Sequence, residues 1–355
     1  MAFGLFKKKK KRTDERYQKL VIKSALKVAE DAVELIFDAP NGLEYTPGQF
    51  ITIIDQVNGE KLRRAYSLCS VAELDENPAV IVKRVPEGRM SNYINDEYAA
   101  GREVEVMEPM GLFSLLPTKT EGRHVVFFGG GSGITPLYSM IRALLNQDPN
   151  AKVDLVFGNR EEKFIIFKDE IQQLSSTHEN FRVLHLLEND PGKLAFHEGR
   201  PNADLIVSIC EHLQADAQSE FYLCGPTPMM DVVTDGLQKF GINDSNIIKE
   251  SFEAPVEEEK GDMSKVTELS ISLDGDDYSL TISRNEPILA QALKADIDMP
   301  YSCQSGLCTA CRGKVTSGSV SIDHAEGLTA EEIDEGYVLT CVGKSLTDTV
   351  KIEMG

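Results

Sequence analysis

The sequence has few positive charges for its length. Its 355 residues include 37 Lys and Arg against 57 Asp and Glu, which gives a formal net charge of −20. Nucleic-acid backbones are bound mainly through cations, so this balance argues against a nucleic-acid-binding protein. An acidic surface can dock on a basic protein partner, but more often it only keeps a protein in solution.

Long apolar runs are also missing. A membrane-spanning helix needs about 20 predominantly apolar residues, and the most apolar stretch, residues 125–145, is interrupted by several glycines and by Arg142. Near the N-terminus, Phe3, Leu5 and Phe6 are too few to form the apolar core of a signal peptide. We therefore expect neither a transmembrane segment nor a secretory leader.

Cysteine is present in an odd number. Seven cysteines in a long chain without a leader argue against a disulfide framework and favour metal-binding or reactive thiols. The cytoplasm is the predicted compartment.

The two charged, non-periodic segments of the chain are predicted to lie outside the domains. Residues 1–16 contain six consecutive cations at positions 7–12, which favours a disordered, solvated tail. The alternative for this tail is weak contact with an anionic membrane surface or a partner. Residues 255–265 are predicted to be a linker.

Residues 17–118 have the pattern of a small antiparallel β-barrel. Short alternating segments are separated by turn signals such as the Pro-Asn-Gly at residues 40–42. Six such strands in about 100 residues suggest closure into a barrel. The predicted strands are residues 19–26, 32–38, 49–55, 63–69, 79–85 and 103–108.

Residues 119–254 alternate between strand and helix patterns. This alternation predicts a doubly wound α/β domain with a parallel sheet. A third module, residues 266–355, follows the linker. The predicted α/β elements are strands at 124–128, 153–157, 182–187, 221–224 and 247–252, and helices at 135–146, 168–174 and 228–240.

The third module carries the most specific motif. Cys303, Cys308 and Cys311 are spaced C-x4-C-x2-C, and Cys341 follows after 29 residues. Thiolates hold iron–sulfur clusters, and this is the plant-type ferredoxin spacing for a [2Fe–2S] cluster. A four-cysteine zinc site is the alternative, but zinc ribbons favour two short cysteine pairs. The spacing therefore predicts a cluster held by these four residues.

A glycine-rich loop at residues 129–136 joins a predicted strand to a predicted helix. Such a loop lets a phosphate approach the backbone and the positive end of the helix. Its spacing differs from the G-x-G-x-x-G fingerprint, so the loop predicts a nucleotide site without assigning the coenzyme.

Three shorter motifs complete a resemblance. They are Arg64-Ala-Tyr-Ser67 on a barrel strand, Gly88-Arg-Met-Ser91, and Cys224-Gly-Pro226 after a strand. Together with the glycine-rich loop, they resemble the ferredoxin–NADP reductase superfamily. With the C-terminal plant-type ferredoxin, the chain resembles the reductase subunits of multicomponent oxygenases, among them that of phenylacetyl-CoA epoxidase. The resemblance implies a flavin-binding β-barrel, an α/β nucleotide domain and an α+β ferredoxin domain of the β-grasp type.

The resemblance also implies how the flavin is held. Arg64 would bind the flavin phosphate, Tyr66 would lie against the ring, and the Ser67 hydroxyl would reach N5. The Gly88–Ser91 segment resembles the loop that holds the second phosphate, which implies FAD rather than FMN. The implied flavin contacts are Arg64, Ala65, Tyr66, Ser67, Val82, Lys83, Arg84, Arg89, Met90 and Ser91.

For the nicotinamide, the resemblance implies a catalytic set of Ser67, Cys224 and Glu250. Cys224 would lie near the hydride-donating carbon, Glu250 beside the nicotinamide, and Phe252 over the flavin. Arg160 follows the second α/β strand, where a cation favours the 2′-phosphate of NADPH, although it could instead stack on adenine. The implied coenzyme contacts are Gly130, Gly131, Gly133, Thr135, Pro136, Asn159, Arg160, Cys224, Gly225, Pro226 and Phe252.

The predicted function is electron transfer from NADPH or NADH to FAD, then to the cluster, and then to an oxygenase, a hydroxylase or another acceptor protein. Two alternatives remain open: a redox-responsive protein that gates partner binding, and a general diaphorase without a dedicated acceptor. Steady-state turnover with cytochrome c would separate an electron-transfer enzyme from a sensor.

Overall fold

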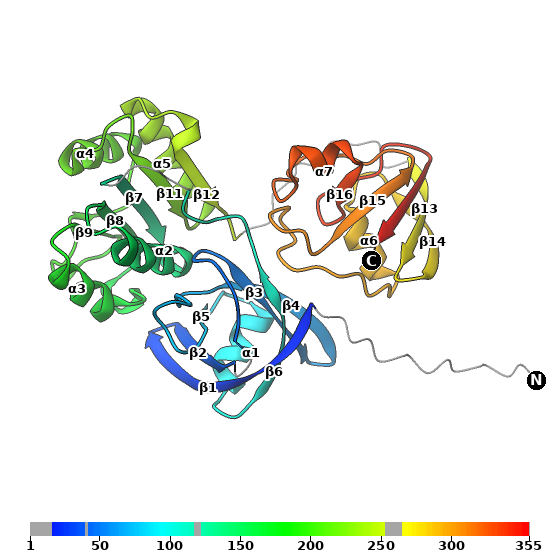
Figure 1. Ribbon diagram of the computed structural model, residues 1–355, viewed down its shortest axis with the longest axis horizontal. Helices are drawn as coiled ribbons and strands as arrows, with labels where there is room; N and C mark the ends of the chain where they lie inside the picture. Colours follow the sequence, from blue (N-terminus) through cyan, green and yellow to red (C-terminus); the bar gives the residue numbers. More distant parts are fainter. Residues whose placement is uncertain (1–15, 40–41, 117–121, 253–264, 355) are drawn as a thin grey trace, which may run out of the picture.

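The described residues form three β-sheets (Figure 1). Each sheet packs against a hydrophobic core of its own. This computed structural model describes residues 16–39, 42–116, 122–252 and 265–354. The predicted N-terminal tail and linker fall almost wholly outside these ranges. Within them, no helix combines the length and the apolar character needed to cross a bilayer.

The first sheet is antiparallel and strongly curved, with strand order β4-β3-β6-β1-β2-β5. Its edge strands β4 and β5 meet through one isolated bridge between Leu68 and Val80. The predicted barrel is therefore confirmed, in a partly open form. A helix that the sequence motifs did not predict, α1, packs on β5 where Asn95 Nδ2 donates to Val82 O at 3.0 Å. The elements are β1 (Tyr17–Ala29), β2 (Ala32–Asp38), β3 (Phe50–Val57), β4 (Glu60–Ser67), β5 (Ala79–Lys83), α1 (Arg89–Glu97) and β6 (Glu103–Met110).

The second sheet is parallel throughout, with strand order β10-β9-β8-β7-β11-β12. Its central strands are apolar almost without interruption, as expected for strands covered by helices on both faces. The predicted doubly wound domain is confirmed, with α4 and β10 as additions. The elements are β7 (His124–Gly130), η1 (Gly131–Gly133), α2 (Ile134–Gln147), β8 (Lys152–Asn159), η2 (Glu162–Phe164), α3 (Lys168–Thr177), β9 (Phe181–Leu187), β10 (His197–Glu198), α4 (Ala203–Leu213), β11 (Glu220–Cys224), α5 (Thr227–Phe240), η3 (Asp244–Asn246) and β12 (Ile247–Glu250).

The third sheet is mixed, with strand order β14-β13-β17-β15-β16 and a parallel β13–β17 pair. Helix α6 buries Ile288, Leu289 and Ala292 in the core of this sheet. This arrangement confirms the predicted α+β ferredoxin domain. The elements are β13 (Val266–Leu273), β14 (Asp276–Ser283), α6 (Ile288–Lys294), β15 (Arg312–Ser317), α7 (Ala330–Asp334), β16 (Tyr337–Leu339) and β17 (Thr349–Met354).

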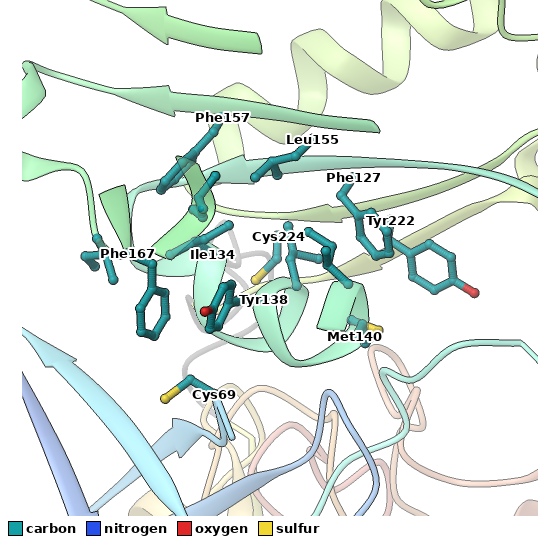
Figure 2. Close-up of a cluster of buried hydrophobic side chains, with 14 of the residues drawn as sticks. Cys69, Phe127, Ile134, Tyr138, Met140, Leu155, Phe157, Phe167, Tyr222 and Cys224 are labelled. Carbon is teal, nitrogen blue, oxygen red and sulfur yellow. The ribbon is translucent and has the colours of Figure 1, made fainter. Parts of the chain in front are cut away.

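Helix α2 joins the barrel to the parallel sheet. Figure 2 shows Tyr138 of this helix beside Phe167, with Cys69 approaching from the barrel; the two rings stack with their centroids 4.1 Å apart. On the same helix, Arg142 donates two hydrogen bonds to Asp75 of the barrel domain, at 2.6 and 2.8 Å. Apolar packing and a bidentate ion pair thus fix the first two domains against each other.

Candidate functional site

A cavity of about 560 Å³ opens where all three domains meet, a size typical of small-molecule sites. Its wall combines β4, the start of α1, the η1–α2 corner, the end of β12 and the loop that begins at Ser302. The site residues predicted from sequence that line it are Arg64, Ala65, Tyr66, Ser67, Lys83, Arg89, Met90, Ser91, Thr135, Glu250, Phe252 and Cys303. Gly88 and Ser132, which belong to the predicted motifs, also line it, and the lining residues outside the predicted motifs are Phe50, Ile81, Val85, Glu87, Ser251, Ser302, Gln304, Ser305 and Leu307.

Strand β4 presents a cation, a ring and a hydroxyl in sequence. The exposed Arg64 donates to the carbonyl of Arg63 at 2.7 Å, and it forms no ion pair with any carboxylate in the described part of the chain. Burial raises the pKa of the Tyr66 phenol, so this ring remains neutral. Ser67 is 5% exposed at the end of the strand. The strand therefore offers an available guanidinium at one end of the cavity and an uncharged wall at the other.

The first turn of α1 forms the wall next to Arg64. Ser91 Oγ accepts a hydrogen bond from the Val85 amide at 3.2 Å, and Arg89 pairs with Glu60 at 2.8 Å. Met90 is buried beneath them. The N-terminus of a helix carries partial positive charge, so this corner favours a phosphate group.

Two predicted flavin contacts lie behind this wall and do not line the cavity. Val82 is fully buried, and its carbonyl accepts from α1. Arg84 pairs with Asp96 of α1, and its amide donates to the Asp31 carbonyl at 2.7 Å. In this structure both residues hold α1 and the β1–β2 turn in place.

The glycine-rich loop after β7 presses against the Cys224-Gly-Pro loop after β11. A β-carbon at Gly133 would lie 2.0 Å from the Cys224 carbonyl oxygen, so only glycine fits there. Thr135 Oγ1 donates to the Ser132 carbonyl at 2.8 Å and fixes the turn into α2. Gly130 lies close to Gly225 and Pro226, whereas Gly131 faces Lys83. The predicted contacts of the two loops that do not line the cavity are Gly130, Gly131, Gly133, Pro136, Cys224, Gly225 and Pro226.

Cys224 and Glu250 are paired neighbours at the ends of β11 and β12. Cys224 is fully buried, and burial raises the pKa of its thiol. Glu250 is 5% exposed, and its Oε2 has no hydrogen-bond partner among the described residues. Burial, assisted by the nearby Cys303, raises the pKa of Glu250 to about 8. The raised pKa favours the protonated acid near neutral pH, and this carboxyl group faces the cavity close to the cluster loop.

Arg160 lies outside the cavity and has a protein partner that the sequence did not reveal. Its Nη2 donates to Asp31 Oδ2 at 2.9 Å, and its guanidinium lies 4.1 Å from the centre of the Phe164 ring. Lys83 approaches the same carboxylate at 3.8 Å. Asn159, beside Arg160, is 8% exposed, and its side-chain amide has no hydrogen-bond partner in the described structure. Asp31 thus ties the nucleotide domain to the barrel.

The four cysteines of the ferredoxin domain lie together, and Cys303 contacts both Cys308 and Cys341. Hydrogen bonding from Cys308 and Cys341 lowers the pKa of the Cys303 thiol, and hydrogen bonding from Cys341 lowers that of Cys311. The Ser305 amide also points to Cys303 Sγ, at 3.5 Å. Among the described residues no three potential ligands converge on a single ion. The four neighbouring thiols would instead hold a [2Fe–2S] cluster, which cysteine thiolates bind at this spacing.

These features together define a class of protein. Arg64 and the N-terminus of α1 fit a flavin with its phosphates. The loops after β7 and β11 fit a nicotinamide coenzyme, and the four neighbouring thiols fit the cluster. A protein that binds these three groups around one cavity is a flavin- and iron–sulfur-containing oxidoreductase that uses NAD(P)H.

Comparison with known proteins identifies the family. Residues 19–115 match the oxidoreductase FAD-binding domain, residues 127–235 the oxidoreductase NAD-binding domain, and residues 271–345 the 2Fe-2S iron-sulfur cluster binding domain. The ferredoxin reductase component of 3-ketosteroid-9-alpha-monooxygenase from Rhodococcus rhodochrous is 33% identical over 350 residues, covering 94% of this chain and 96% of that protein. The chain belongs to this family of oxygenase reductase components.

Two further relatives agree with this assignment. One component of 1,2-phenylacetyl-CoA epoxidase from Escherichia coli (strain K12) is 29% identical over 348 residues, covering 95% of this chain and 97% of the relative. The solved structure of phthalate dioxygenase reductase is 25% identical with a TM-score of 0.60, over 96% of this chain and 99% of that one. The three-domain arrangement thus matches a structure described as modular for electron transfer from pyridine nucleotides to [2Fe-2S].

Proposed function

We propose that the chain transfers electrons from NADPH or NADH, through FAD and the [2Fe–2S] cluster, to an oxygenase or hydroxylase component. The observation that carries the proposal is the shared cavity, which is lined by flavin-motif residues, by Glu250 and by the cluster ligand Cys303. Each NAD(P)H releases two electrons and one proton, whereas a [2Fe–2S] cluster accepts one electron at a time. The flavin supplies the chemistry that converts a two-electron donor into single electrons.

The predicted site residues receive roles that follow from their positions. Arg64 would bind the flavin phosphate. Tyr66 would cover the flavin ring, and the Ser67 hydroxyl would approach N5 of the same ring. Glu250, neutral at pH 7, would hydrogen-bond at the junction of nicotinamide and flavin. Cys224 would support this junction from behind, because it is buried and does not line the cavity.

The acceptor is proposed from the relatives and from the cluster type. Plant-type clusters have reduction potentials near −400 mV, so electrons flow readily to an acceptor of higher potential. The matched relatives are named as components of a ketosteroid monooxygenase and an epoxidase. We propose the cytoplasm as the compartment, because all seven cysteines are unpaired and four of them are assigned to the cluster.

Replacing a cluster ligand tests the electron route. In Cys308→Ser we expect loss of the cluster absorbance and of cytochrome c reduction, whereas ferricyanide reduction by NADPH or NADH continues from the flavin. Cys210→Ser is the matched control, since Cys210 is a buried thiol of α4 outside the site. Loss of ferricyanide reduction in a folded Cys308→Ser protein would contradict the proposal.

A further inference from the structure

Arg63 is a buried cation next to the flavin motif that is not among the residues lining the cavity. Its side chain is only 3% exposed, whereas the adjacent Arg64 is exposed and lines the cavity. Consecutive side chains of a strand point to opposite faces, so these two arginines serve different surfaces. Burying an arginine costs desolvation free energy, which its hydrogen bonds must offset. The hydrogen-bond partners of Arg63 are therefore informative.

In the described part of the chain, the side-chain partners of Arg63 all belong to the ferredoxin domain. Nη1 donates to the Met299 carbonyl at 2.8 Å, and Nη2 donates to Asp298 Oδ1 at 2.9 Å. The guanidinium carbon lies 4.8 Å from the centre of the Tyr301 ring. These three residues lie within the five positions that precede Cys303, the first predicted cluster ligand. One barrel side chain therefore fixes the segment that leads into the cluster loop.

Other contacts from the same sheet face support this attachment. Thr52 of β3 hydrogen-bonds through its hydroxyl to Ser302, and both residues are buried. Lys61 of β4 approaches Asp298 Oδ2 at 3.3 Å. Apolar packing adds to these polar contacts, and its members from both domains are Phe50, Ile54, Met107, Cys308 and Ala310. We call Phe50, Thr52, Ile54, Arg63 and Met107 the ferredoxin-docking face.

We propose that Arg63 is a positioning residue that holds the ferredoxin domain on the barrel, with the cluster loop closing the flavin cavity. The inference rests on the proposed electron route. In each transfer the reduced flavin loses one electron and one ferric ion of the cluster becomes ferrous. Two such transfers follow each hydride, and the acceptor protein reoxidises the cluster between them. Arg63 touches neither group; it sets how often the cluster loop occupies the position in which transfer occurs.

The size of the effect follows from the contacts that are lost. Charge-assisted hydrogen bonds are the strong ones, and removing the Arg63 pair should lower the equilibrium constant for docking by at least about ten-fold. Asp298 is 59% exposed, so Asp298→Asn removes the charge partner of Arg63 without a buried cavity. Its effect should have the same direction and be smaller, because the Met299 and Tyr301 contacts remain.

The experiment separates docking from hydride transfer. The holoprotein is mixed anaerobically with NADPH or NADH, and flavin bleaching and the paramagnetic signal of the reduced cluster are followed separately. Small-angle X-ray scattering of the oxidised holoprotein reports docking without any turnover. For Arg63→Met we expect unchanged flavin bleaching, slower cluster reduction in proportion to the lost docked fraction, and a larger radius of gyration. Arg63→Lys, which keeps the charge but not the two-pronged geometry, should fall between wild type and Arg63→Met.

Arg102→Met is the matched control. Arg102 also pairs with a carboxylate, Asp55, and lies over the rings of Tyr93 and Tyr98, but these partners all belong to the barrel domain. It should leave the ratio of cluster reduction to flavin bleaching at the wild-type value.

The two hypotheses fail in different ways. Wild-type cluster that stays oxidised while the flavin is bleached would overturn the electron route, and scattering would still report docking. Unchanged scattering and cluster reduction in both Arg63→Met and Asp298→Asn would overturn the positioning role. The positioning role would also be overturned by flavin bleaching that slows in proportion to cluster reduction, which would make Arg63 a flavin-site residue.

Discussion

Gly306 in the cluster loop provides a sharp test of how tightly this loop is built. Its φ of 79° is in the left-handed region, and an added β-carbon would lie 1.8 Å from the His324 carbonyl oxygen. A left-handed L-residue costs about 1–2 kcal/mol. Overpacking a closed site adds about 1–3 kcal/mol, so Gly306→Ala should lose roughly 2–5 kcal/mol. The obstruction is backbone, and the Gly327 amide donates to the Gly306 carbonyl at 2.7 Å, so the two loops cannot separate without losing this bond.

Gly275 in the β13–β14 turn is the matched control for Gly306. Its φ is 86°, but nothing lies within 4 Å of the position of an added β-carbon. Gly275→Ala should therefore cost only the conformational part, about 1–2 kcal/mol. In a domain of this size each kcal/mol lowers the melting temperature by about 4–8 °C. Thermal bleaching of the cluster measures the domain directly, with iron content as a second readout. Equal bleaching temperatures for the two variants would refute the argument.

Three further predictions concern charged groups. Because the pKa of Glu250 is raised to about 8, its carboxylic-acid band should be present in infrared spectra at about pH 6 and disappear by about pH 10. The Glu250→Gln variant should show no such change. A wild-type protein without the band at about pH 6 would contradict this prediction. Asp154, 1% exposed, accepts two hydrogen bonds from Arg182, at 2.6 and 2.9 Å, so Asp154→Asn should lower the free energy of unfolding at pH 7 by about 3 kcal/mol in urea titrations. Hydrogen bonding holds the pKa of Asp154 below its usual value despite burial, so this stabilisation is present near neutral pH and is lost as the pH falls through the acid range. For coenzyme choice, Arg160→Ala should lower kcat/KM for NADPH by about ten-fold and leave kcat/KM for NADH unchanged. Asp31→Asn should release Arg160 and increase the preference for NADPH. A wild-type preference for NADH that Arg160→Ala leaves unaltered would overturn the NADPH prediction.

Local chemistry was readable from the sequence because each motif lies within a few residues. The C-x4-C-x2-C run fixes three cluster ligands in one loop, and the structure brings Cys341 to them. Strand limits were less exact. Strand β4 begins at Glu60, three residues before the predicted start, because Asn58 and Gly59 form a tight hairpin turn with φ of 53° and 82°. The dipeptide Asn-Gly is a strong hairpin signal and would have placed this start.

Helix α4 shows a different limit of sequence reasoning. The elements predicted from the sequence leave out the apolar stretch around Cys210, and a short apolar run fits either a strand or a helix. In the structure this stretch is a helix that Asn202 caps: the Asn202 side chain accepts a hydrogen bond from the Leu205 backbone amide at 2.9 Å. Asn before an apolar run is a helix-start signal, so this element was open to prediction.

The docking of the three domains could not be read from any motif, yet it left a trace in β3. Residues Phe50 to Ile54 are all buried, whereas a barrel strand with one face in water should alternate between buried and exposed side chains. The continuous apolar pattern therefore indicates that something covers the outer face. This pattern does not identify the covering element, because an apolar face accepts any apolar partner. The partner is specified by the polar exceptions within that face: Thr52 hydrogen-bonds to Ser302, and Arg63 binds the segment before the cluster. Without its ferredoxin domain the same barrel would expose Phe50 and Ile54 and leave Arg63 without its partners. The placement of the cluster is thus encoded as much in the flavin domain as in the ferredoxin domain itself.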